Sequence, residues 1–138
     1  MLVLVDTPIW SLALRRRHTD LNPREQALTT AFRELVQDGR AQLVGPVRQE
    51  LLSGIRDEAV FKKLRDQLRA FVQIPLDVVD YEEAAHLNNH CRARGIAGSS
   101  IDFLICAIAL RHDWQIFTTD RDFSRYASVV ALQLYNAR

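Results

Sequence analysis

Cysteine and long apolar runs are both scarce in this sequence of 138 residues, and each shortage excludes a class of protein. The only two cysteines, Cys91 and Cys106, lie in stretches with helical patterning, so we expect reduced packing residues and no disulfide framework. No apolar run reaches the ~18 residues that a membrane-spanning helix needs. The apolar start, residues 2–5, is too short for a signal peptide and has no basic residues before it. Together these features predict a cytoplasmic protein without a membrane span.

Lysine is scarce as well, because only two of the 18 basic residues are lysines and the other sixteen are arginines. The arginines begin with the run 15–17, and further basic residues follow as far as Arg69. Guanidinium groups match the geometry of phosphates, so a basic face beside an acidic site would suit RNA. The 17 acidic residues bring the net charge to only +1, and charge alone therefore favours a solvated helical surface.

Strand and helix patterns alternate along the chain. Strands are predicted at 2–5, 42–45, 115–120 and 129–135, with 71–76 as a further candidate that Pro75 restricts to a sheet edge. Helices are predicted after Thr7-Pro8, after Asn22-Pro23, from Pro46 to Ser53-Gly54, over 57–70, from an Asp80–Glu83 capping box to Gly95, and after a Ser99 cap. This alternation predicts one α/β domain over residues 1–138, with a parallel sheet covered on both faces.

Four acids fall where such a sheet binds its ligands. Asp6 ends the first strand, Asp120 ends the strand at 115–120, and Asp102 lies in the first turn of an otherwise apolar helix. Glu50 lies in the helix after the second strand. Ligands of open parallel sheets bind beyond the carboxyl ends of the strands, so we expect these carboxylates to converge. Since gathered carboxylates repel one another, and Mg²⁺ or Mn²⁺ prefers carboxylate oxygens, the placement predicts a metal site.

Taken singly, each acid also has a structural interpretation. Asp6 could favour the dipole of the helix it precedes, Glu50 could be a surface residue, and Asp102 has the capping-box spacing from Ser99. Asp120 and Asp122 share a turn in which aspartate is common, so either could be the fourth acid, and Asp122 could instead cap the segment around Phe123. Only the placement of the four acids together favours a catalytic metal site.

The histidines do not form a zinc constellation. His86 and His90 have the i, i+4 spacing of two metal ligands on one helix, but no third ligand lies nearby in the sequence. A surface or half-buried role is the favoured interpretation.

Four segments in order resemble the motifs of PIN-domain ribonucleases: LVDTPIW at 4–10, VRQELL at 47–52, SSIDFLICAIA at 99–109 and IFTTDRDF at 116–123. The resemblance extends from residue 2 to about residue 135, and the length and motif order are most similar to the VapC-type toxins of type II toxin–antitoxin pairs.

The resemblance implies an α/β/α sandwich with a parallel sheet of about five strands, and Mg²⁺- or Mn²⁺-dependent endonucleolytic cleavage of RNA. It also implies a homodimer silenced by a small antitoxin that lies across the active-site groove. Asp6, Glu50, Asp102 and Asp120 match the four motif acids in order. Thr7 and Thr118 match hydroxyl residues that we expect to orient carboxylates or waters.

A mechanism follows as a hypothesis: Asp6 and Asp102 hold the principal metal, assisted by Glu50 and by Asp120, and water attacks the phosphate in line. Basic helices between residues 15 and 69 would hold the RNA backbone, and Trp10 could stack a base, pack under the antitoxin, or belong to the core.

The main competing interpretation is a catalytically silent module whose cleft only binds RNA or a protein partner. Two phosphoryl chemistries on doubly wound folds are disfavoured. A haloacid-dehalogenase-like phosphatase needs a second aspartate at position 8, which is proline, and a receiver domain needs a lysine near the last strand, where none occurs.

Overall fold

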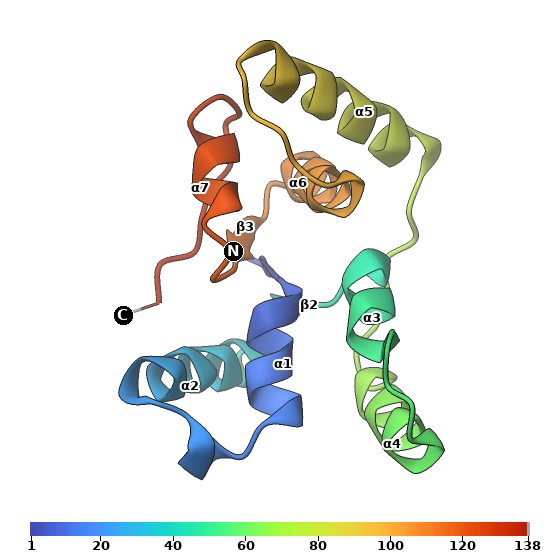
Figure 1. The fold of residues 1–138 in the computed structure, drawn as a ribbon, viewed down its shortest axis with the longest axis vertical. Helices are drawn as coiled ribbons and strands as arrows, with labels where there is room; N and C mark the ends of the chain where they lie inside the picture. The colour runs from blue at the N-terminus through green and yellow to red at the C-terminus, as the bar shows by residue number, and fades with distance from the viewer. Residues whose placement is uncertain (138) are drawn as a thin grey trace.

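The computed structural model describes residues 1–137 and centres on three parallel strands (Figure 1). These are β1 (Val3–Val5), β2 (Ala41–Gln42) and β3 (Gln115–Phe117), and their order in the sheet is β2-β1-β3. Leu4 pairs with Gln42 on one side and with Ile116 on the other. Because all three strands are parallel, their carboxyl ends open onto one edge.

Every residue of β1 is fully buried, as expected for a continuous apolar run at the centre of a covered sheet. Helices flank the strands on both sides: in Figure 1, α5 and α6 lie above the strands and α1 and α2 below them. The helices are α1 (Thr7–Arg15), α2 (Pro23–Gln37), α3 (Gly45–Leu52), α4 (Glu58–Leu68), α5 (Val78–Ala93), α6 (Ser100–His112) and α7 (Asp122–Ala127), with one 3₁₀ turn at His18–Asp20. The predicted α/β class is thus confirmed.

The sheet is smaller than the resemblance implied, with three strands in the described part of the chain instead of about five. The predicted strand at 129–135 is reduced to one parallel bridge, in which the Ile116 N–H donates to the Gln133 carbonyl and the Tyr135 N–H to the Ile116 carbonyl. The edge strand expected at 71–76 is absent among residues 1–137, and this segment runs irregularly into α5. Pro75 has no N–H to donate there.

Helix α5 begins earlier than predicted. Its capping box joins Asp77 and Asp80, not Asp80 and Glu83, with the Asp77 N–H donating to Asp80 at 2.9 Å. The Asp80 carboxylate also accepts two hydrogen bonds from the Arg111 guanidinium, at 2.6 and 2.8 Å, which tie α5 to α6. Burial raises the pKa of Asp80, but the hydrogen bonds from Arg111 and from the Asp77 backbone, together with the positive charge of Arg111, lower the pKa overall.

Trp10 belongs to the core. Its side chain is fully buried, its indole N–H donates to the Val5 carbonyl at 2.9 Å, and its ring contacts Phe32 and Phe71 edge-on. A buried indole cannot stack on a base, so that interpretation of Trp10 is wrong. Cys91 and Cys106 are buried free thiols, as predicted. Across residues 1–137, no helix combines the length and apolar character that crossing a bilayer requires.

Candidate metal centre

Asp6 is the N-cap residue of α1 and lies directly after β1. Only 5% of the residue is exposed, and its Oδ2 accepts a hydrogen bond of 2.7 Å from the Thr118 hydroxyl. Burial raises the pKa of Asp6 from 3.8 to about 6, although the bonds from Thr118 and from the Thr7 backbone partly offset this rise. The negative charges of Asp102 and Glu50 raise it further. A buried carboxylate beside other carboxylates is a position that a cation would stabilise.

Thr118 connects this first acid to the loop after β3. Its hydroxyl donates to Asp6 and accepts from the Asp120 N–H at 3.0 Å. The Asp120 Oδ1 in turn accepts from the Asp122 N–H at 2.9 Å. The Thr118 hydroxyl thus bonds the side chain of one predicted ligand, Asp6, and the backbone of a second, Asp120.

Asp102 lies at the point where the acids meet. Asp102, Asp120 and Asp122 can each offer one carboxylate oxygen such that these atoms all lie within 4.8 Å of one another. Burial raises the pKa of Asp102, its hydrogen bonds with Tyr126 and Ser99 lower it, and the charges of Asp120 and Asp122 raise it again. The predicted cap is present as well, since the Ser99 hydroxyl accepts from the Asp102 N–H at 3.0 Å.

Glu50 reaches the site through a different contact. It is exposed in α3, and its Oε1 accepts a hydrogen bond of 2.8 Å from the Thr7 hydroxyl. Both predicted hydroxyl residues, Thr7 and Thr118, therefore donate to carboxylates. Glu50 and Asp6 lie outside the close group of three, but the negative charge of Asp102 raises the pKa of Asp6.

The structure brings Asp122 into the site together with Asp120, so both candidates for the fourth acid remain open. The predicted capping role of Asp122 is wrong: α7 has Arg121 at its N-cap, and it is the Asp120 side chain that accepts the Asp122 N–H. Asp122 also lies 3.5 Å from Arg125, one helical turn away.

The donor set fits a hard divalent cation. It offers only carboxylate and hydroxyl oxygens, which Mg²⁺ and Mn²⁺ prefer. The alternative pair, His86 and His90, is exposed on α5, where His86 faces Glu83 at 3.8 Å. Neither histidine belongs to a group of three metal-binding side chains within residues 1–137.

Sequence reasoning missed Tyr126, whose hydroxyl donates to Asp102 Oδ2 at 2.7 Å. The spacing of the acids in the sequence did not indicate that a tyrosine would bond one of them. The one available clue was helical spacing, because Tyr126 lies one turn after Asp122 on α7.

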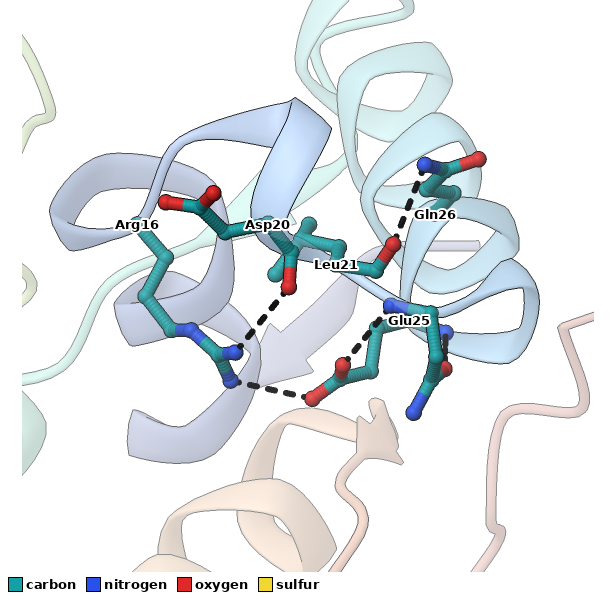
Figure 2. Close-up of polar contacts among 6 residues, drawn as sticks. Arg16, Asp20, Leu21, Glu25 and Gln26 are labelled. Atoms are coloured by element: carbon teal, nitrogen blue, oxygen red, sulfur yellow. Dashed lines mark hydrogen bonds and ion pairs between the residues drawn. The ribbon is translucent and has the colours of Figure 1, made fainter.

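A groove of about 420 Å³ lies between α1 and α2 beside the acids, since its lining includes Pro8 and Thr119, the neighbours of Thr7 and Asp120. Figure 2 shows its polar wall: the Arg16 guanidinium donates to Glu25 at 3.0 Å and to the Asp20 carbonyl. Glu25 also closes the capping box of α2. Ser11, Arg24 and Thr119 complete the polar lining.

A larger cavity of about 560 Å³ lies between α5 and the start of α6, but none of its lining residues is an acid. Ser100 and Ile101 in its wall are close to Asp102 in the chain, but none of the predicted acids lines either this cavity or the groove. The candidate site is therefore defined by the acids and not by the larger cavity.

Comparison with known proteins agrees with this geometry. The chain is 27% identical over 141 residues to Ribonuclease VapC11 of Mycobacterium tuberculosis and to a VapC ribonuclease of Mycobacterium bovis, covering 99% of this chain and 100% of each relative. Its fold is similar to that of FitAcB from Neisseria gonorrhoeae (TM-score 0.76, 18% identity, 99% and 98% of the two chains). It is also similar to VapBC2 from Rickettsia felis bound to a promoter DNA fragment (TM-score 0.75, 16% identity, 99% and 98%). The family described as "PIN domain" matches residues 3–129, and the chain therefore belongs to the PIN domain family.

Proposed function

We propose that this chain, acting as one domain over residues 1–138, is a metal-dependent endoribonuclease and the toxin of a toxin–antitoxin pair. The observation that carries the proposal is the convergence on Asp102: it shares a close group with Asp120 and Asp122, and its charge raises the pKa of buried Asp6. The ribonuclease names of the two mycobacterial relatives support RNA as the substrate.

In this proposal Asp6 and Asp102 hold Mg²⁺ or Mn²⁺, assisted by Glu50 and by Asp120 or Asp122. When bound, the cation supplies an activated water and neutralises charge on the scissile phosphate. Thr118 fixes the Asp6 carboxylate and the loop bearing Asp120, and Thr7 fixes Glu50. These hydroxyls hold the acids in place before the cation arrives, which limits the reorganisation that binding needs.

The groove between α1 and α2 supports a path for the RNA backbone. It adjoins the acids through Pro8 and Thr119, and Arg24 lies in its wall. Arg15 and Arg17 are exposed at the end of α1, and no acidic partner for them is found among residues 1–137. Guanidinium groups in the groove wall and at the end of α1 away from Asp6 offer the phosphate contacts that nucleic-acid binding requires.

The proposed partners are a small antitoxin that covers the active-site groove and a second copy of the chain, both in the cytoplasm. Support comes from the solved relatives, which include FitAB bound to a DNA fragment and VapBC-1 from nontypeable Haemophilus influenzae. Co-purification with the product of a small neighbouring gene tests the first partner, and light scattering of the purified chain tests the second.

The deciding experiment is cleavage of a mixed cellular RNA pool by the purified protein, with Mn²⁺ or Mg²⁺, with EDTA, and with Asp6→Ala in parallel. Asp66→Ala, which removes an exposed acid of α4, is the matched control. We expect discrete cuts that disappear with EDTA and with Asp6→Ala but persist in the control. The products should carry 5′-phosphate and 3′-hydroxyl ends.

Products with cyclic 2′,3′-phosphate ends would contradict the water route, because they arise when the RNA 2′-hydroxyl attacks. Folded, antitoxin-free protein that neither cuts RNA nor binds Mn²⁺ would favour the silent binding module instead.

A further inference from the structure

Tyr126 is a fully buried tyrosine whose hydroxyl ends at the acidic site. The hydroxyl donates to Asp102 Oδ2 at 2.7 Å, and the side chain of Tyr126 is fully buried. The ring lies between Phe103 of α6 and Phe123 of α7, with centroid distances of 5.0 and 5.3 Å. A ring packed on two sides cannot swing away, so its hydroxyl is a fixed donor.

Gly98 makes room for this hydroxyl. A Cβ at position 98 would lie 2.4 Å from the Tyr126 hydroxyl oxygen and 2.8 Å from two ring carbons. Such distances are far inside van der Waals contact, so the ring or the loop would have to shift to admit a Cβ. The loop before α6 therefore accepts only glycine at this point while Tyr126 keeps its bond to Asp102.

We propose that Tyr126 is a positioning residue for the metal centre, seated by Gly98. It holds one oxygen of Asp102 and fixes the rotation of the carboxylate, which leaves the second oxygen for the proposed cation. A phenylalanine would fill the same space, so the packing of α7 does not explain the hydroxyl. This inference rests on the proposed metal-dependent function, and it assigns a role to a residue outside the acid motifs.

Tyr126→Phe tests the role because it removes one oxygen atom and keeps the ring. The measurement is Mn²⁺ binding by isothermal titration calorimetry to the full chain without RNA. Loss of a hydrogen bond that orients a metal ligand typically lowers metal affinity on the order of 10- to 100-fold, and we expect a decrease in this range. Tyr135→Phe is the matched control, since Tyr135 packs on Phe117 and bonds no acid of the site; its Mn²⁺ affinity should equal that of the wild type.

General destabilisation must be separated from positioning. Leu68→Ala removes a fully buried side chain from α4, which carries no acid of the site, and should lower thermal stability while leaving Mn²⁺ affinity unchanged. If Leu68→Ala weakens Mn²⁺ binding as much as Tyr126→Phe does, the positioning role is refuted.

Gly98→Ala gives an independent test through a double-mutant cycle. Alone, it should weaken Mn²⁺ binding by pushing the Tyr126 hydroxyl from Asp102. In the Tyr126→Phe background it should weaken binding little further, because the hydrogen bond is already gone. Fully additive effects would overturn the proposed link between Gly98 and Tyr126.

The wild type separates the two proposals. If the wild-type chain binds Mn²⁺ and Tyr126→Phe binds it equally well, the positioning role fails while the metal site stands. If the wild type binds no Mn²⁺, the proposed function and the positioning role both fail.

Discussion

The buried carboxylate of Asp6 should make the stability of the metal-free protein depend on pH in an unusual direction. Burial raises its pKa from 3.8 to about 6, so the folded state binds a proton more tightly than the unfolded state. Well below pH 3.8 both states are protonated and the raised pKa costs nothing. As pH rises from about 4 to about 6, the folded chain must give up a favoured proton, and the free energy of unfolding falls.

A difference of about 2 between the two pKa values corresponds to about 3 kcal/mol, which is the largest loss that Asp6 can cause. Asp6→Asn removes the charge and keeps the shape, so the variant should lack this loss. Relative to the wild type, its free energy of unfolding should rise by up to about 3 kcal/mol between about pH 4 and about pH 7.

Urea denaturation in EDTA across this pH range measures both proteins, and the difference between them isolates Asp6 from the other titrating groups. Added Mn²⁺ at neutral pH should stabilise the wild type, by about 2.7 kcal/mol at 100 times the dissociation constant, and the variant much less. A difference that stays flat with pH would refute the burial and charge assigned to Asp6.

Three further predictions concern the stability of the fold, each measured by urea denaturation. Arg111→Ala leaves Asp80, which is only 1% exposed, without its partner and should lower the free energy of unfolding; an unchanged value would mean that water replaces the guanidinium. Ser99→Ala removes the α6 cap and should cost about 1 kcal/mol, whereas Ser99→Asp should retain most stability. Leu68→Ala should cost about 2–5 kcal/mol, and a much smaller loss would indicate that α4 collapses into the cavity.

The sequence allowed the positions of the acids to be predicted because they follow from local rules. An apolar run followed by an acid and a helix cap puts Asp6 at a strand end, and parallel strands place Asp6 and Asp120 at one edge. The Ser99 cap was visible for the same reason, since its partner lies three residues away.

The features that could not be predicted from the sequence depend on contacts between distant segments. Asp80 bonds Arg111 from 31 residues away, and Tyr126 meets Asp102 across 24 residues. Neither pair has a local signature, so the capping box of α5 was misplaced and the tyrosine was missed. The length of the last strand was also predicted wrongly, because pairing at a sheet edge depends on the neighbouring backbone. Leu134 has β-forming neighbours in the sequence but pairs with β3 at one bridge only.

The central claim is that these carboxylates hold the cation that RNA cleavage requires, and locating Mn²⁺ in crystals by its anomalous scattering tests it most directly. The account predicts a peak within bonding distance of Asp102 and Asp6 or Asp120 in the wild type, and no such peak in Asp102→Asn. A wild-type crystal with Mn²⁺ bound elsewhere, or with none at saturating concentration, would contradict the account.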